Sequence, residues 1–112
     1  MTRYLISFDH GAMDHIPDEE GPAVGEAAHA VSQEAIDAGA FVFAGGFTEE
    51  VSVVAIDGTV TDAAKGKPQI GGGMIVDVPS RDDALKWAAK IAVACRCAQE
   101  CHEVLPDPAV GN

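Results

Sequence analysis

Two helix-like segments separate short strand-like segments along this chain, and their order is the feature that most limits its fold. From residue 23 to residue 38, small apolar residues recur every three or four positions, which is typical of a helix with one buried side. Gly21-Pro22 suits the start of this helix, and Gly39 is expected to end it in a left-handed conformation. Such a helix must bury its apolar stripe against another element.

The second helix is predicted after Ser80, because Ser80 and Asp83 have the layout of a helix-capping pair. Its expected apolar stripe consists of Leu85, Ala88, Ala89 and Ala92, widened by Ala84, Trp87 and Ile91. Both helices are therefore expected to present one apolar side and one polar side.

The segments around the helices alternate apolar and polar residues with the period of an extended chain. In the first, residues 3–9, the side chains of Tyr4, Ile6 and Phe8 share one face. Further strands are expected at residues 41–47, within residues 51–60 with a turn at Asp57-Gly58, and at residues 73–78 and 100–105. The order β-α-β-β-α-β predicts one α+β domain over residues 1–112, a ferredoxin-like antiparallel sheet with two helices on one face.

The sheet face turned away from the helices is also predicted to be apolar. Leu5 points away from the face that holds Tyr4 and Ile6. Ile75 likewise points away from its neighbours in the strand at residues 73–78. Because the helices cover only one face, we expect a second copy of the chain to cover the other, which gives a homodimer.

Charge argues against several classes of partner. The chain has 7 basic and 18 acidic residues, a net charge of −11, so nucleic acid and anionic membranes are expected to be repelled. No apolar run reaches the roughly 18 residues that a membrane span needs. The N-terminal segment enters a strand pattern without the pattern of a secretory signal, so a cytoplasmic location is expected.

Three consecutive glycines, Gly71-Gly72-Gly73, follow a lysine-containing loop and raise the question of a phosphate-binding site. A phosphate loop leads into a helix and ends in Gly-Lys-Ser/Thr. These glycines lead instead into the strand pattern of residues 74–78. We therefore interpret them as structural residues that permit a bulge or a close approach of the backbone.

Residues 60–62, 71–78 and 80–88 resemble the YCII-related family, and more specifically its DGPF branch. That branch typically carries a V-T-D-G-P-F loop, a paired glycine entering a strand, and a helix close to S-x-D-E-A-L-E-W-A. The resemblance extends over nearly the whole chain and departs at Ala63-Ala64-Lys65, which replaces Gly-Pro-Phe. It implies a ferredoxin-like fold paired into a dimeric α+β barrel.

The loop after the first strand gathers Asp9, His10, Asp14, His15 and Asp18. A histidine beside a carboxylate is a typical general base, so His10 is a catalytic candidate, and Asp9 and His15 are candidates for substrate binding. The same residue types can instead bind a divalent metal, or form nothing more than a solvated acidic loop.

His29 and Asp37 on the first helix are further catalytic candidates, because the resemblance implies a His–Asp dyad in some YCII relatives. Asp37 matches the Asp position, whereas the His position falls on Ala28, so that His29 is one residue late. One residue is about 100° around a helix, so a half-buried structural histidine is the alternative. For an enzyme, the pocket is expected between the sheet and this helix, near the end of the first strand, with Asp62 contributing to substrate binding.

Cys95, Cys97, Cys101 and His102 place four potential metal ligands within eight residues. Structural zinc sites usually combine two separated ligand pairs, and the sequence has no second pair. We therefore interpret the cysteines as reduced core residues, and we expect neither a metal nor an organic cofactor.

Two classes of function are open to such a chain. The first is a cofactor-independent small-molecule enzyme of lyase or isomerase type with a histidine general base. The second is a non-catalytic ligand-binding or regulatory homodimer. The resemblance supports this second class, because members of the family often occur near or fused to sigma-factor regulators of transcription. A cleft that joins His10 or His29 to a carboxylate favours the enzyme, whereas an apolar cavity with solvent-exposed histidines favours the binder.

Overall fold

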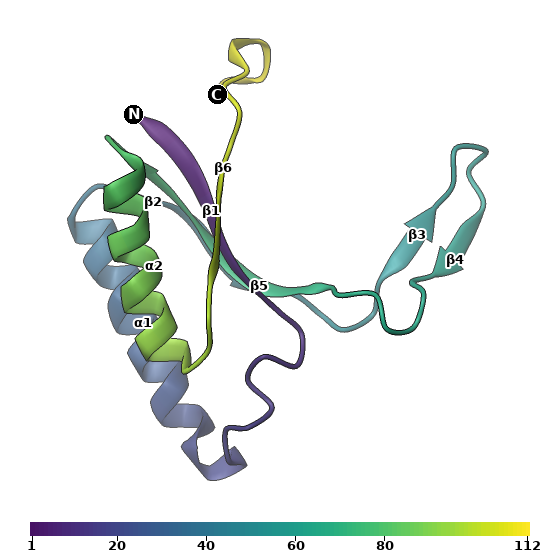
Figure 1. Ribbon diagram of the computed structural model, residues 1–112, viewed down its shortest axis with the longest axis horizontal. Coiled ribbons are helices and arrows are strands. Elements are labelled where there is room, and N and C mark those ends of the chain that lie inside the picture. Colours follow the sequence, from purple (N-terminus) through teal and green to yellow (C-terminus); the bar gives the residue numbers. More distant parts are fainter.

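A computed structural model describes residues 1–112 and has the α+β class that the sequence predicts. It contains two helices, a four-stranded antiparallel sheet and a separate two-stranded sheet (Figure 1). In chain order the elements are β1 (Thr2–Asp9), η1 (Asp18–Glu20), α1 (Gly21–Asp37), β2 (Phe41–Gly46), β3 (Ser52–Val54), β4 (Val60–Asp62), β5 (Ile70–Val78), α2 (Arg81–Cys95), β6 (Glu100–Glu103) and η2 (Pro108–Val110). Neither α1 nor α2 is both long and apolar enough to cross a membrane.

The main sheet has the strand order β2-β5-β1-β6, and every neighbouring pair is antiparallel. In its centre, Ile6 of β1 lies opposite Met74 of β5 on one side and Cys101 of β6 on the other. Figure 1 shows α1 and α2 side by side on one face of this sheet. The core between the helices and the sheet consists of Tyr4, Ile6, Ala35, Ala40, Met74, Val76, Val78, Ala84, Ala88, Ile91 and Cys95.

The ends of the helices carry the signals that the sequence predicts. The Asp83 backbone N–H donates to Ser80 Oγ at 3.2 Å, and the Ser80 hydroxyl donates to Asp83 Oδ2 at 2.9 Å. The first of these bonds satisfies one of the free backbone amides at the start of α2. Gly39 follows α1 with a φ of +74°, so the left-handed end is confirmed.

The buried side of α2 is rotated from the predicted one. The helix buries Ala84, Ala88, Ile91 and Cys95, whereas Leu85 is 41% exposed and Ala89 is exposed. The prediction centred the stripe on Leu85, Ala88, Ala89 and Ala92 from helical spacing alone. The residues that are buried are instead those whose size fits the space. The small side chains of Ala84 and Ala88 are the ones enclosed between the helix and the sheet.

The segment predicted as one strand within residues 51–60 forms part of a hairpin outside the main sheet. β3 pairs with β4 around a turn in which Gly58 has a φ of +89°, so the predicted turn at Asp57-Gly58 is confirmed. Figure 1 shows this hairpin, residues 52–62, reaching away from the helices and the main sheet. We refer to it below as the arm. Its alternating pattern specifies an extended conformation but not the sheet that it joins.

Candidate functional site

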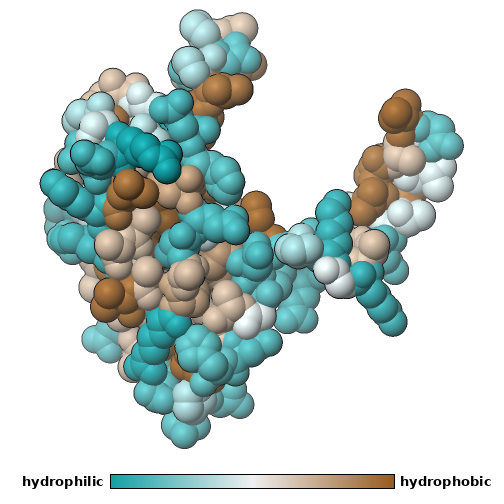
Figure 2. Space-filling view, in the orientation of Figure 1, coloured by the Kyte–Doolittle hydropathy of each residue, from teal (hydrophilic) through white to brown (hydrophobic).

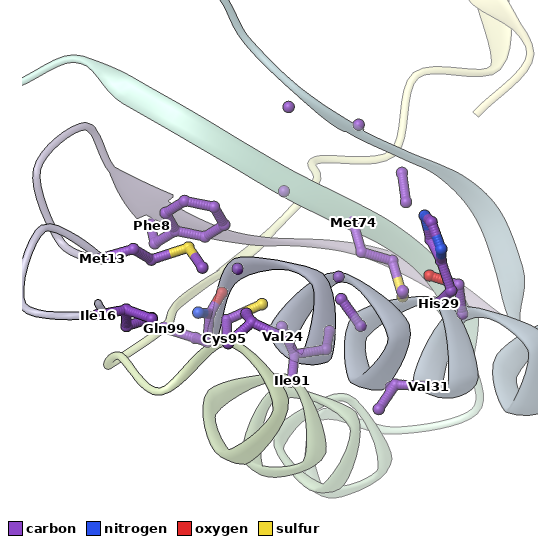
Figure 3. A pocket seen from close by; sticks show the side chains of 18 of the residues that line it. Phe8, Met13, Ile16, Val24, His29, Val31, Met74, Ile91, Cys95 and Gln99 are labelled. Atoms are coloured by element: carbon purple, nitrogen blue, oxygen red, sulfur yellow. The ribbon is translucent and has the colours of Figure 1, made fainter. Parts of the chain in front are cut away.

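A pocket of about 700 Å³ lies between the main sheet and α1, where the sequence analysis places the site of an enzyme (Figure 3). One wall comes from the sheet, with Phe8 of β1 and Met74 of β5. The opposite wall comes from α1, with Val24 and Val31. The apolar stripe of α1 does not fill the space against the sheet, because most of its residues are alanine and valine.

The segment between β1 and α1 forms one end of the pocket. This segment contributes Met13 and Ile16, which Figure 3 shows at the same end of the pocket as Phe8. An ion pair holds the segment near its C-terminal end, because Arg96 Nη1 lies 2.7 Å from the Glu20 carboxylate. Both side chains are about half exposed, so this pair contributes positioning more than stability.

The second helix and the segment after it complete the pocket with Ile91, Cys95 and Gln99. The chain turns sharply here, because Arg96 has a left-handed φ of +56° directly after α2. That turn sends Gln99 back towards the pocket. Its Nε2 donates to the carbonyl oxygen of Cys97 at 3.4 Å, and its Oε1 is buried without any hydrogen-bond partner.

His29 is the only predicted catalytic residue that lines the pocket. Figure 3 shows its ring beside Met74, at the opposite end from Phe8, and the residue as a whole is exposed. Asp37, its proposed partner, lies about two helical turns away on α1. Its carboxylate accepts a hydrogen bond from Gln33 Nε2 at 2.9 Å, and no contact joins it to His29.

His10 leaves the end of β1 but does not line the pocket. Its backbone N–H donates to the Gln69 carbonyl oxygen at 2.8 Å, and its Nε2 lies 3.1 Å from the Thr48 carbonyl oxygen. These bonds tie the end of β1 to the segments that lead to and from the arm. Asp9 and His15, the predicted substrate-binding residues beside it, are also absent from the pocket wall.

Asp62 lies at the end of β4, away from the main pocket. It lines a separate hollow of about 490 Å³ together with Glu49 and Glu50. The structure therefore divides the predicted site residues among four places, namely the main pocket, the end of α1, the end of β1 with the segment that follows it, and the base of the arm.

All three cysteines are free, and Cys95 is the buried one. Burial raises the pKa of the Cys95 thiol, and the same cause raises the pKa of the Cys97 and Cys101 thiols. No three histidine, cysteine or acidic side chains come close enough together to hold a metal ion.

Sequence reasoning missed the apolar residues that form most of the pocket wall. Met13 and Ile16 are apolar residues in an otherwise polar segment before α1. Their presence there is the sequence feature that indicates packing of this segment against the core. Gln99 carries no local signal, because a glutamine near a helix end is usually solvated.

No protein-family model matches this chain, and no curated protein matches it in sequence. The functional reading of the pocket therefore depends on its own geometry and chemistry.

Proposed function

We propose that this protein is a ligand-binding module that holds a small, mainly apolar molecule in the pocket between the sheet and α1. The observation that carries the proposal is the wall itself, because about half of the 21 lining residues, 11 in all, are hydrophobic and only a few bear polar groups. Preformed cavities of several hundred Å³ with apolar walls and few polar groups are the usual form of small-molecule sites.

Binding without catalysis is the better-supported class. General-base catalysis needs a proton-accepting side chain near the substrate, and a second group usually orients that side chain. His29 is the only histidine at the pocket, and neither a carboxylate nor any other side chain makes a hydrogen bond to its ring. His10 has a hydrogen-bond partner of its own outside the pocket. An exposed histidine without a carboxylate partner, at the edge of an apolar cavity, is the arrangement that favours a binder.

A blocking substitution tests the binding proposal. Ala28 lines the pocket, whereas Ala30 lies two residues further along α1, is exposed and does not line the pocket. Ala28→Trp should fill part of the pocket and abolish binding of a small aromatic probe such as p-cresol. Ala30→Trp is the matched control and should bind the probe like the parent. Equal affinity in both variants and the parent would place the ligand elsewhere.

A second candidate function is proton-transfer catalysis of lyase or isomerase type with His29 as general base. The position of His29 at the pocket supports it. Once a turned-over compound is found, His29→Ala should lower the rate roughly 10²–10⁴-fold. His10→Ala serves as the control because His10 lies outside the pocket. Full activity in His29→Ala would exclude His29 as the base.

We further propose that the fold is ferredoxin-like and that the chain is related to the DGPF branch of the YCII-related family. The strand order supports the fold, because β5 lies between β1 and β2 and β6 pairs with the free edge of β1. Two helices on one face of such a sheet complete the arrangement. The T-D loop at β4 and the capped start of α2 are the parts that support the relationship.

A homodimer through the open sheet face follows from the same fold proposal. Phe43, Ile75 and Leu5 form a row across neighbouring strands on the face without helices, and Phe43 is 53% exposed. The arm adds apolar side chains that nothing in the chain covers, including Val54 and the fully exposed Ile56. Figure 2 shows that hydrophobic side chains gather on the arm, apart from the helices and the main sheet. A second copy covers both surfaces reciprocally through one two-fold axis.

A further inference from the structure

The pocket contains one polar atom whose hydrogen-bonding capacity is unused. Gln99 lines the pocket, and its Oε1 is shut off from bulk water without accepting a hydrogen bond. It is the only buried side-chain nitrogen or oxygen in the chain without a partner. Buried polar atoms nearly always have hydrogen-bond partners. An unpaired buried oxygen in a binding pocket therefore indicates that a hydrogen-bond donor of the ligand is its partner.

The hydrogen bonds of Gln99 Nε2 fix the orientation of the side-chain amide. Nε2 lies 3.4 Å from both the carbonyl oxygen and the Sγ of Cys97, and it donates to both. The reversed amide would set Oε1 against the Cys97 carbonyl oxygen, and neither atom is a donor. The free atom is therefore the oxygen, which accepts hydrogen bonds and cannot donate them.

The surroundings of Oε1 are apolar. Figure 3 shows Met13, Ile16 and Cys95 around the Gln99 side chain, below the ring of Phe8. Met13 is unbranched and adapts its conformation readily, so a molecule that enters the pocket can displace its thioether and reach Oε1. A donor that reaches this oxygen forms its hydrogen bond away from competing water.

We propose, on the basis of the binding function above, that the ligand is a neutral molecule with an apolar body and one hydrogen-bond donor that is directed at Gln99 Oε1. A phenolic or alcoholic hydroxyl and an aromatic N–H share this chemistry. A carboxylate does not, because Oε1 is only an acceptor and Asp18 also lines the pocket of a chain with net charge −11. An ammonium group is also disfavoured, because apolar walls do not replace its water.

Two probes of matched shape test the donor. The probes p-cresol and p-xylene differ only in that a hydroxyl replaces a methyl group, and p-toluate supplies the carboxylate. Their dissociation constants are measured by calorimetry for the parent protein and for Gln99→Met, which keeps the length of the side chain but removes the acceptor. Ala30→Trp, on the outer side of α1, is the control variant.

The expected result is a change in preference between the two neutral probes. From the parent to Gln99→Met, the affinity for p-cresol relative to p-xylene should fall about tenfold, the size of one neutral hydrogen bond. Binding of p-xylene should be unchanged or tighter, and p-toluate should bind weakest to the parent. If both neutral probes bind and their ratio is the same in both proteins, the donor inference is wrong while the binding function stands. If neither probe binds the parent protein, the binding function fails and the donor inference fails with it.

Discussion

The ring of Phe8 lies against Gly72 across the pair formed by β1 and β5. A Cβ added at Gly72 would come within 2.8 Å of Phe8 Cζ and within 3.1 Å of the Gly45 carbonyl oxygen. The first distance is shorter than carbon–carbon contacts in proteins and the second is tight, so a side chain at position 72 would force the Phe8 ring to move. Phe8 is part of the pocket wall, and the glycine-rich start of β5 therefore helps to shape the pocket.

Gly72→Ala should destabilise the protein and displace the Phe8 ring. The added methyl group overpacks the site, and the unfolding free energy should fall by about 1–3 kcal/mol. Urea denaturation measures the change. Gly25→Ala is the matched control, because nothing lies within 4 Å of its Cβ position in α1 and alanine favours a helix. The control should be as stable as the parent or more stable, and equal destabilisation of both variants would contradict the account.

A charge on the arm should weaken the proposed dimer without unfolding the chain. Val54 is 65% exposed on β3, and Val93 is 82% exposed on α2 away from both surfaces proposed for the interface. Val54→Asp places a carboxylate in the apolar contact, whereas Val93→Asp adds the same charge elsewhere. Sedimentation at micromolar concentration should show Val54→Asp shifted towards monomer and Val93→Asp unchanged. A monomeric parent protein would contradict the dimer itself.

The buried thiol of Cys95 should make the protein less stable in alkali. Burial raises the pKa of Cys95, so the folded state favours the neutral thiol over the thiolate. The stability that the neutral Cys95 thiol contributes is fully present below the unfolded pKa of about 8.5. This contribution is lost as the pH rises through the folded pKa. The unfolding free energy of the parent should therefore fall as the pH rises above the unfolded pKa, and that of Cys95→Ala should fall less steeply over the same interval. A parent protein whose stability is constant or rises over this interval would contradict the burial of the thiol.

The sequence predicted the local elements well because their signals are local. The helix cap at Ser80 and the left-handed Gly39 each depend on neighbouring residues only, and both are present. The α+β class followed from the order of these elements. The arm was not predicted, because an alternating pattern does not specify which strand will pair with it. The exposure of Leu85 was not predicted either, because the burial of a side chain depends on how closely the helix approaches the sheet.

The site was harder to predict because its parts come from distant segments. The pocket joins Met13 from the segment after β1, His29 from α1 and Gln99 from the segment after α2. Their convergence depends on the sheet order and on the turn at Arg96. Sequence proximity suggested a cluster around His10 instead, and the structure directs that side chain to the Thr48 carbonyl oxygen.

The methionine methyl groups provide the most direct test of the central claim, which is that the pocket binds a small apolar molecule. The chain has 3 methionines. Met13 and Met74 line the pocket, whereas Met1 is 77% exposed at the N-terminus and serves as an internal control. With methyl-labelled methionine, titration with p-cresol should shift the Met13 and Met74 resonances along one saturable curve and leave Met1 unchanged. If no resonance moves, or if all three drift together without saturation, the pocket does not bind such molecules and the account is wrong.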